Sequence, residues 1–426
     1  MRLLYQLGKI VDEAKEEYEK TKVFRYKKLI ERKGKANKSI IALGDYSSFI
    51  EYLKGNGYEN SIQMIYVDPP FFSKANYAAS FKIDNRKFDM FAYEDKWNND
   101  AKCYIKDMTI GLMKMKDLLK DDGVIAVHLD WHAVHYARLI LDEIFGADNF
   151  INEIIWQYKS GGSSKKSFAR KHDNILVYGK TKNYKFNSVK EKSYNRNLKP
   201  YKFKGVNEYK DEIGWYTLVN ARDVWQIDMV GRTSKERTGY ATQKPKALIK
   251  RFIEAFTDEE DIVADFFAGS GTTLSCCIDF NRSCMSCDIN PMAISFNLVK
   301  LVEKNNSFEF IWDEKYDINI GNLDVKKNKN NIKLIKYEPK INKEDFNACD
   351  FEFIMDLIKN KPTKLINYVN IDLNYDGNNH KESLSLRRKS NEILDYIELK
   401  DDTFSDIHIV SVDIFGRISE TTIMGN

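Results

Sequence analysis

Cysteine is scarce in this sequence. Six cysteines in 426 residues exclude the dense disulfide framework of small secreted proteins. Cys284 and Cys287 form a CxxC pair, but no second pair follows at the spacing of a zinc site. The pair falls in the apolar run 283–287, which is typical of a buried strand, and positions three apart on a strand face opposite sides. We therefore expect both thiols to pack in the core.

Long apolar runs are also missing, since none approaches the roughly 20 residues that a membrane-spanning helix needs. Charged residues such as Asp12 and Glu13 come early in the sequence, so we expect no apolar stretch of the kind found in a signal peptide. No GxxxxGK[ST] loop is present, which argues against a nucleoside-triphosphate motor. With 43% hydrophobic and 31% charged residues, we expect an intracellular, soluble enzyme or binding protein of two to three domains.

A strong excess of one charge is absent from the whole chain but present in one segment. The formal net charge is only +4, from 67 basic and 63 acidic residues. Residues 159–210 nevertheless hold 15 basic and three acidic residues, a local net charge of +12, with eight aromatic residues interleaved. A solvated lysine-rich surface gives the same pattern, and the alternative is a surface for a polyanion such as nucleic acid.

Short apolar runs alternate with amphipathic stretches along most of the chain. The runs 62–67 and 123–129 predict strands, whereas the spacing in 134–145 predicts a helix. Residues 1–38 predict one or two helices, and the composition after about Asn305 predicts a small β-rich module. Strands that alternate with helices favour a mostly parallel α/β sheet with helices on both faces.

A glycine loop follows the strand that begins at Ile262. Gly269 and Gly271 allow the backbone to turn tightly and to approach a ligand closely, and we expect Thr272 to cap the next helix. The third glycine of a dinucleotide-binding loop is missing. Asp288 ends the next strand, where an acidic side chain can accept hydrogen bonds from ribose hydroxyls. The block favours a nucleoside without phosphates, such as S-adenosylmethionine. A plain glycine turn is the alternative.

A second block, Asp68-Pro69-Pro70-Phe71, ends the strand 62–67. In open α/β sheets this end of a strand faces the active site. The prolines fix the backbone, so that the Asp68 side chain and the Pro69 carbonyl become neighbouring acceptors. Two acceptors and the Phe71 ring suit an exocyclic amino group on a flipped base. A simple proline turn at a strand end is the alternative.

Together the two blocks resemble motifs of the amino-group DNA methyltransferases of bacterial restriction-modification systems. Asp68–Phe71 looks like their catalytic D/N/S-P-P-Y/F/W motif, and Asp265–Thr273 looks like their S-adenosylmethionine motif. Thr242–Pro245 resembles the segment before it, and Leu43–Asp45 fits the family pattern as well. The catalytic motif comes first in the chain, which is the permuted arrangement of the β class. The resemblance covers roughly residues 39–305.

The resemblance implies a circularly permuted, Rossmann-like α/β fold with a mostly parallel seven-stranded sheet. An inserted DNA-recognition region and a small C-terminal α/β or β-rich module complete the expected architecture. The expected parts are an N-terminal helical segment (1–38), a catalytic half (39–158), a DNA target-recognition region (159–237), a cofactor-binding half (238–305) and a C-terminal accessory module (306–426).

The resemblance also implies roles for particular residues, and it implies no metal. The catalytic residues would be Asp68, Pro69, Pro70 and Phe71, with Phe168 as a candidate second ring against the base. The S-adenosylmethionine site would comprise Asp45, Lys244, Asp265, Phe266, Phe267, Ala268, Gly269, Ser270, Gly271, Thr272 and Asp288. The residues expected to contact DNA are Lys165, Lys166, Arg170, Lys171, Arg232, Lys235 and Arg237.

Asp at the first catalytic position is similar to adenine-N6 enzymes, whereas Ser is more usual in cytosine-N4 enzymes. The expected function is therefore site-specific methylation of adenine N6 in double-stranded DNA, in the bacterial cytoplasm. A cytosine-N4 enzyme, a catalytically silent DNA-specificity subunit and an RNA substrate stay open as alternatives. A cognate restriction endonuclease and a homodimer are compatible partners, and the residues do not decide on either.

Overall fold

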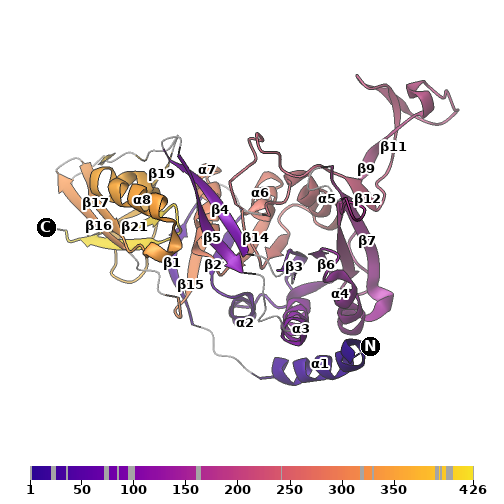
Figure 1. The fold of residues 1–426 in the computed structure, drawn as a ribbon, viewed down its shortest axis with the longest axis horizontal. Helices are drawn as coiled ribbons and strands as arrows, with labels where there is room; N and C mark the ends of the chain where they lie inside the picture. The colour runs from indigo at the N-terminus through magenta and orange to yellow at the C-terminus, as the bar shows by residue number, and fades with distance from the viewer. Residues whose placement is uncertain are drawn as a thin grey trace.

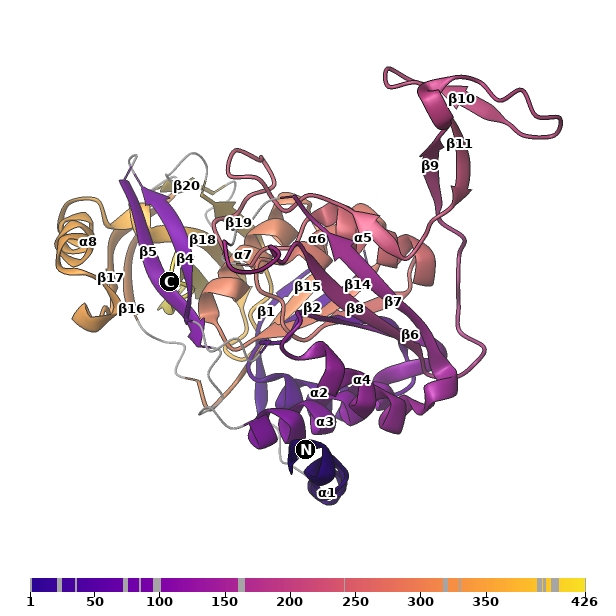
Figure 2. The same ribbon diagram turned by 45° about the vertical axis from the view of Figure 1, so that its right-hand side comes forward.

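A computed structural model of the chain describes residues 2–20, 25–34, 37–71, 76–83, 86–94, 101–159, 165–240, 242–316, 321–328, 331–388, 393, 396–399 and 406–425. Its largest sheet has ten strands in the order β1-β15-β2-β14-β13-β3-β6-β8-β7-β12 (Figures 1 and 2). β1 and β8 run antiparallel to their neighbours, and the other eight strands are parallel to one another. The strands span Tyr26–Arg32 (β1), Ser39–Leu43 (β2), Ile62–Val67 (β3), Leu119–Leu129 (β6), Phe150–Gln157 (β7), His172–Gly179 (β8), Val224–Gln226 (β12), Ile262–Asp265 (β13), Ser283–Asp288 (β14) and Phe308–Asp313 (β15).

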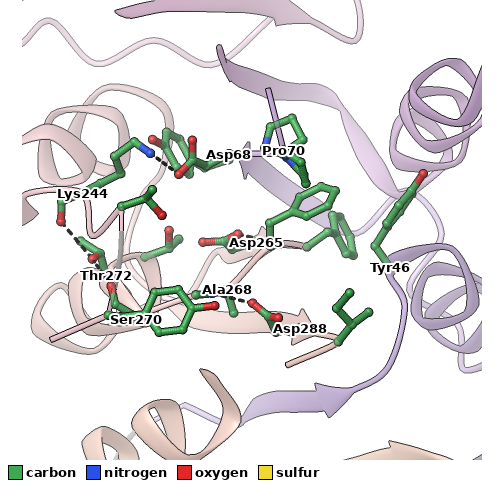
Figure 3. A pocket seen from close by; sticks show the side chains of 18 of the residues that line it. Tyr46, Asp68, Pro70, Lys244, Asp265, Ala268, Ser270, Thr272 and Asp288 are labelled. Carbon is green, nitrogen blue, oxygen red and sulfur yellow. Dashed lines mark hydrogen bonds and ion pairs between the residues drawn. The ribbon is translucent and has the colours of Figure 1, made fainter. Parts of the chain in front are cut away.

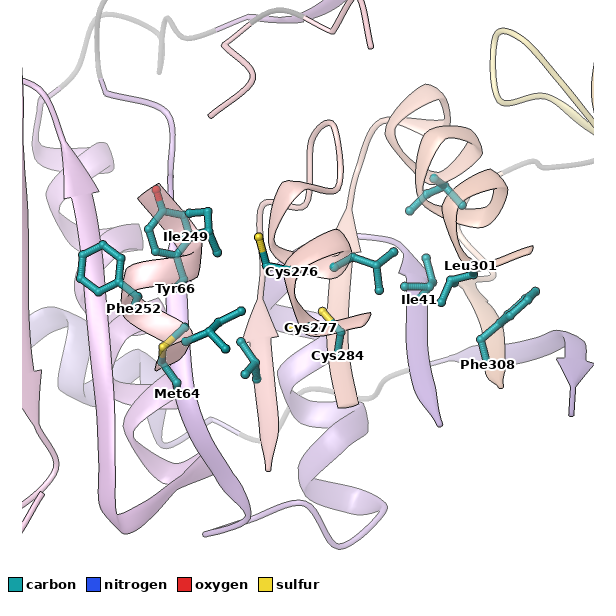
Figure 4. Close-up of a cluster of buried hydrophobic side chains, with 14 of the residues drawn as sticks. Ile41, Met64, Tyr66, Ile249, Phe252, Cys276, Cys277, Cys284, Leu301 and Phe308 are labelled. Atoms are coloured by element: carbon teal, nitrogen blue, oxygen red, sulfur yellow. The ribbon is translucent and has the colours of Figure 1, made fainter. Parts of the chain in front are cut away.

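Helices cover both faces of this sheet, which confirms the predicted three-layer arrangement. One core lies under α5, α6 and α7 and includes Phe252, Cys277 and Leu301 (Figure 4). The other lies under α2, α3 and α4, and α1 packs on α3 from outside. The helices span Arg2–Tyr18 (α1), Tyr46–Gly55 (α2), Ala101–Leu118 (α3), Val134–Leu141 (α4), Lys246–Phe256 (α5), Thr272–Asp279 (α6) and Pro291–Glu303 (α7).

The buried CxxC pair behaves as expected for a strand. Both Cys284 and Cys287 are fully buried in β14. Cys284 joins the core under α5, α6 and α7, whereas Cys287 joins the core on the opposite face. The two thiols therefore lie on opposite sides of the sheet, and each acts as a small apolar packing residue.

The expected seven-stranded sheet is wrong in its strand count. Seven consecutive strands from β2 to β7 in the sheet order form its centre, and β15, β1 and β12 extend it at the two edges. β15 lies beyond the expected boundary at residue 305, so the main sheet continues into the segment that we assigned to the C-terminal module. β8 and β12 likewise place parts of the segment 159–237 within the sheet.

The expectation of helices throughout residues 1–38 is wrong for β1. This strand pairs with β15, and the pairing shifts register between Lys28 and Ile30. The resulting bulge lets two consecutive residues, Leu29 and Ile30, both enter the core. The alternation that marks a strand in the sequence is therefore lost, and the charged neighbours resemble a helix surface.

A three-stranded arm projects from the body beside β12, the edge strand of the sheet. It consists of residues 190–220, and its sheet has the order β10-β11-β9. Figures 1 and 2 show the arm extending away from the rest of the molecule in both views. Its strands are Lys190–Tyr194 (β9), Glu208–Lys210 (β10) and Trp215–Asn220 (β11).

The C-terminal module is rich in strands, as predicted. It contains a three-stranded sheet (β16-β17-β20), a four-stranded sheet (β19-β18-β21-β22) and helix α8. The hairpin β4–β5, which follows the Asp68–Phe71 turn in the chain, packs Ile83 and Phe88 into the core of this module. The elements are Asn76–Ile83 (β4), Arg86–Glu94 (β5), Gly321–Asn328 (β16), Asn331–Pro339 (β17), Ala348–Asn360 (α8), Ile366–Tyr375 (β18), Leu384–Arg387 (β19), Tyr396–Glu398 (β20), Asp406–Asp413 (β21) and Ile418–Ile423 (β22).

Arg86 fastens that hairpin to α8. Its guanidinium donates hydrogen bonds to the carbonyl of Cys349 at 2.7 Å and to Asp350 Oδ1 at 3.0 Å, and it lies over the ring of Phe353. Among the described residues, no helix is long and apolar enough to cross a membrane.

Candidate active site

A cavity of about 390 Å³ opens where the parallel strands end. It brings together segments that are far apart in the sequence: the turn after β3, the glycine loop after β13, the end of β14 and the start of α2 (Figure 3). The predicted site residues that line it are Asp45, Asp68, Pro69, Pro70, Phe71, Lys244, Asp265, Phe266, Phe267, Ala268, Gly269, Ser270, Thr272 and Asp288.

The turn after β3 presents one carboxylate to this cavity. Asp68 Oδ2 accepts a hydrogen bond from the Lys244 ammonium, and both side chains are mostly buried, at 18% and 10% exposed. Asp68 Oδ1 has no hydrogen-bond partner among the described residues. A buried acceptor without a donor costs free energy, so this oxygen marks a place where a ligand donor fits.

Phe71 is held from behind by His128 on β6. The two rings are stacked, with centroids 6.0 Å apart and planes at 28°. The imidazole itself is fixed on both sides, because Nδ1 bonds with the Tyr66 hydroxyl at 2.7 Å and Nε2 with Asp173 at 3.3 Å. His128 is a fully buried core residue, and it also sets the position of the Phe71 ring.

The same network keeps Asp173 ionised. Burial opposes its charge, but the hydrogen bond and positive field of His128, the charge of Lys244 and the hydrogen bond from Tyr158 outweigh burial, so the pKa of Asp173 lies below its usual value. A charged Asp173 in turn anchors the imidazole, and this contact gives the Phe71 ring a rigid support.

The glycine loop is built against α7. Gly271 has a φ of +73°, and a Cβ there would lie 2.6 Å from Asn297 Oδ1. Asn297 Nδ2 donates to the Gly269 carbonyl at 3.3 Å, and Lys300 Nζ donates to the Gly271 carbonyl at 3.1 Å. Contrary to our expectation for the cofactor site, Gly271 does not line the cavity. It forms the contact between the loop and α7 instead.

Thr272 is the first residue of α6 and does not cap it as we expected. The capping position is taken by Gly271, and the Thr272 hydroxyl donates to the Lys244 carbonyl at 3.0 Å. This bond ties the segment that carries Lys244 to the glycine loop. Because the Lys244 ammonium also pairs with Asp68, Lys244 joins the turn after β3 to the glycine loop.

Two acidic groups in the cavity wall have strongly shifted pKa values. Asp288 accepts hydrogen bonds from the backbone of Gly269 and Asn290, each at 2.8 Å. Desolvation outweighs these bonds and raises the pKa of Asp288 to about 6. Desolvation likewise raises the pKa of Asp265 to about 7. A bound cation, or a hydroxyl group that donates a hydrogen bond, would stabilise the ionised form of both carboxylates.

Asp45 performs a structural task at the same cavity. Its carboxylate caps α2 by accepting from the Ser48 backbone at 3.0 Å, and it also pairs with Lys315. Burial opposes its charge, but the bonds from Lys315 and Ser48 hold the pKa of Asp45 below its usual value. The carboxylate therefore stays negative at the cavity wall.

The cavity fits a positively charged nucleoside. Phe266, Phe267 and the half-exposed Ile289 offer apolar surface, whereas Asp45, Asp265 and Asp288 offer negative charge and acceptors. Lys244, a cation in the wall, is already paired with Asp68. The residues therefore suit a sulfonium compound with ribose hydroxyls better than a phosphorylated ligand.

The residues expected to contact DNA lie on two loops. Lys165, Lys166, Arg170 and Lys171 lie between β7 and β8, and Arg232, Lys235 and Arg237 lie between β12 and α5. Both loops begin at the carboxyl ends of strands parallel to β3, so they leave the sheet at the edge of the cavity.

Phe168 is fully exposed and does not line the cavity, so its contact with the base stays a prediction. On the same loop, the guanidinium of Arg170 lies 4.1 Å from the ring centre of the half-exposed Trp131, which follows β6. The loop is thus attached at Arg170, whereas Phe168 faces solvent.

Several cavity residues were missed in the sequence. Tyr46 and Ser47 adjoin Asp45, and Tyr240 shortly precedes Thr242, so a wider window around each motif would have included them. Asp107 comes from the middle of α3 and carries no such signal, because only the packing of α3 against α2 brings it to the cavity. Gly44, Thr242, Gln243 and Thr273 lie within the motifs recognised in the sequence but were not assigned to the site, and the other missed residues are Tyr66, Ile249 and Ile289.

Residues 62–300 match the N6_N4_Mtase family, which is described as DNA methylase. The chain is 31% identical over 272 residues to the type II methyltransferase M.HpaI of Haemophilus parainfluenzae, covering 63% of this chain and 76% of that protein. It is also 31% identical over 267 residues to M.BglII of Bacillus subtilis, covering 59% and 67%.

Solved structures give weaker similarity. The cytosine-N4-specific PvuII DNA methyltransferase aligns with a TM-score of 0.42 and 15% identity over 65% of this chain and 90% of that chain. A complex of M1.HpyAVI with SAM aligns with a TM-score of 0.40 and 17% identity over 64% and 99%.

Proposed function

The chain belongs to the N6_N4_Mtase family of DNA methylases, and on this premise we propose that it transfers a methyl group from S-adenosylmethionine to the exocyclic N6 of adenine in double-stranded DNA. S-adenosylmethionine dependence and a DNA substrate follow from the family. The choice of adenine rests on Asp68 at the first catalytic position, where the resemblance associates serine with cytosine-N4 enzymes.

One observation carries the proposal. The Asp68–Phe71 turn and the glycine loop face one cavity, and Asp68 keeps an oxygen without a partner among the described residues. An exocyclic amino group has two N–H donors, and the turn offers the Asp68 carboxylate and the Pro69 carbonyl. Hydrogen bonds to both acceptors would localise the nitrogen lone pair and aim it.

The proposed role of Phe71 is to hold the flipped base by stacking. A stacked base gains about 1–3 kcal/mol, and the ring is held in place by His128. Lys244 pairs with the Asp68 carboxylate, so an entering amino group would share or replace this partner. We therefore propose that Lys244 acts next to Asp68 at the base, as well as in the S-adenosylmethionine site.

S-adenosylmethionine supplies an activated methyl group on a sulfonium. The residues of this chain would then bind and position it: Asp288 by accepting ribose hydroxyls, Asp265 by its negative charge, and the glycine loop by close approach of its backbone. Direct transfer of such a methyl group depends on alignment more than on acid-base strength, and the groups described here provide alignment.

The product base tests this function. Duplex DNA is incubated with the purified chain and S-adenosylmethionine carrying a labelled methyl group, and the nucleosides are separated by mass. We expect N6-methyl-2′-deoxyadenosine. N4-methylcytosine would replace the adenine proposal by the cytosine alternative, and label on RNA in preference to DNA would contradict the DNA substrate. No transfer by a chain that binds both partners would indicate a specificity subunit.

The affinity for S-adenosylmethionine should depend on pH. Asp288, with a pKa of about 6, is neutral at lower pH, and the cationic cofactor favours its ionised form. Affinity should therefore fall as the pH drops from 8 to 5, by about tenfold through Asp288 and further through Asp265, whose pKa is about 7. Calorimetric titration across this range checks the result. Asp288→Asn should bind more weakly at pH 8 and show a flatter profile, and a flat wild-type profile would contradict this assignment.

The proposed DNA contacts follow from the two loops at the cavity edge. Their lysines and arginines would bind phosphates, which positions the duplex without reading sequence. By analogy with the type II relatives, we also propose that the chain acts beside a cognate restriction endonuclease, whose target the methylation would protect.

A further inference from the structure

The arm of residues 190–220 exposes eight large apolar or aromatic side chains. The tip of the arm is the segment between β9 and β11, residues 195–214. Within it, Tyr201 and Phe203 are 41% and 62% exposed, and Ile213 is 61% exposed. Contiguous exposed apolar surface on a soluble protein marks a binding site. The exposed large apolar residues of the arm are Tyr194, Leu198, Tyr201, Phe203, Val206, Tyr209, Ile213 and Leu218.

Most carboxylates of the arm are used internally. Glu208 accepts from the backbone of Tyr201 and Lys202, each at 2.7 Å, and Asp211 accepts from Lys192 at 2.7 Å. Glu191, at the base of the arm, pairs with Arg222 at 2.7 Å. These carboxylates thus shape the arm and neutralise its base.

The cations near the tip have no such partners. Five exposed basic residues form no ion pair or hydrogen bond by their side chains within the described part of the chain: Arg196, Lys199, Lys202, Lys204 and Lys210. One exposed carboxylate, Glu212, stands against them. The tip therefore combines free positive charge with exposed aromatic rings, and this combination is typical of surfaces that bind nucleic acid.

We propose that the tip of the arm binds duplex DNA outside the site where the base is methylated. This inference rests on the proposed function, and it adds a second contact to the loops at the cavity. Because the arm projects from the body beside β12 (Figure 2), its tip reaches DNA only when the duplex extends beyond the target. The arm thus makes affinity depend on DNA length.

A second copy of the chain fits the arm less well. A symmetric dimer contact brings the same patch of both copies together, and the exposed tips carry charge of one sign. Like charges would then meet, whereas the phosphates of DNA neutralise them. Self-association is therefore a contradicting outcome of the test below.

The test compares DNA length and salt. The triple variant Lys199→Gln/Lys202→Gln/Lys204→Gln is made in the full chain, and its affinity is measured by fluorescence anisotropy on duplexes of about 12 and about 40 base pairs that share one target site. On the long duplex we expect the slope of log affinity against log salt to fall by about 0.9 for each phosphate that the variant no longer binds. On the short duplex we expect no change.

A matched control removes the same amount of charge elsewhere. The triple variant Lys340→Gln/Lys359→Gln/Lys361→Gln replaces three exposed lysines of the C-terminal module and should leave binding to both duplexes unaffected. A second variant deletes the arm: the backbone of Ala221 bonds to the Val189 carbonyl at 2.9 Å, so a short glycine linker can replace residues 190–220. The deletion variant should bind the long duplex no more tightly than the short one, and it should still transfer methyl groups to the short duplex.

Two results would overturn the inference. One is an equal fall in affinity on both duplexes, which would assign the arm to the target itself. The other is unchanged DNA binding together with a shift from dimer to monomer in light scattering, which would assign the arm to self-association. A wild-type chain that transfers no methyl group to any duplex contradicts the proposed function instead, and DNA affinities still report on the arm.

Discussion

Replacing Asp68 by alanine is expected to lower the rate of methyl transfer by roughly 10²–10⁴-fold, the range for losing a positioned polar group at a reacting atom. The binding of S-adenosylmethionine should weaken far less than the rate, and only because the Lys244 ammonium loses the carboxylate that it pairs with in the wild type. The rate falls because the amino group of the base keeps only one acceptor, the Pro69 carbonyl, and its lone pair is no longer aimed.

Single-turnover assays with labelled S-adenosylmethionine measure the rate, and calorimetry measures cofactor binding. Asp68→Asn serves as the matched variant, because asparagine keeps one acceptor oxygen of similar position and stands at this place in the family motif. We expect it to retain more activity than Asp68→Ala. Transfer by Asp68→Ala at the wild-type rate would remove Asp68 from the mechanism.

Replacing Gly271 by alanine is expected to weaken S-adenosylmethionine binding by roughly tenfold or more, which corresponds to about 1.4 kcal/mol. The new Cβ would lie 2.6 Å from Asn297 Oδ1, and Asn297 is fully buried and bonded to the loop. Either the loop or α7 must shift. We also expect the free energy of unfolding to fall by about 1–3 kcal/mol, the usual cost of overpacking.

Gly57→Ala provides the control. Gly57 has a similar positive φ, +83°, but no atom lies within 4 Å of the position that a methyl group would take there. The substitution therefore carries the backbone strain without the collision, and S-adenosylmethionine binding should be unchanged. Denaturant unfolding and calorimetry are run on both variants. Equal effects of the two substitutions would show that contact with Asn297 is unimportant.

The central strands and both motif blocks could be predicted because their signals are local. β3 and β14 are short apolar runs, and an acid closes each of them; parallel strands buried on both faces read as such runs. The carboxyl ends of these strands then meet at one edge, which brings Asp68 near Asp288 without any knowledge of long-range contacts.

The remainder depended on contacts that no local pattern records. The pairing of Lys244 with Asp68 joins two segments that only the sheet brings together. β1 could not be predicted because its bulge removes the alternation of a strand. β8 was not assigned to the main sheet because it lies in a segment whose positive charge suggested a separate region. Asp107 reaches the cavity through helix packing alone. The outline of the site was thus readable, whereas its internal bonds were not.

The pairing of β13 with β3 has a consequence for biosynthesis. Val263 pairs with Met64 and Ala264 with Ile65, so β3 acquires this neighbour only after β13 has left the ribosome. Contacts of such long range form slowly. Until then the nascent chain carries β3, whose six residues all end up buried, with one unpaired edge, which is the kind of edge that aggregates. Translation speed and chaperone supply should therefore affect the yield of active protein.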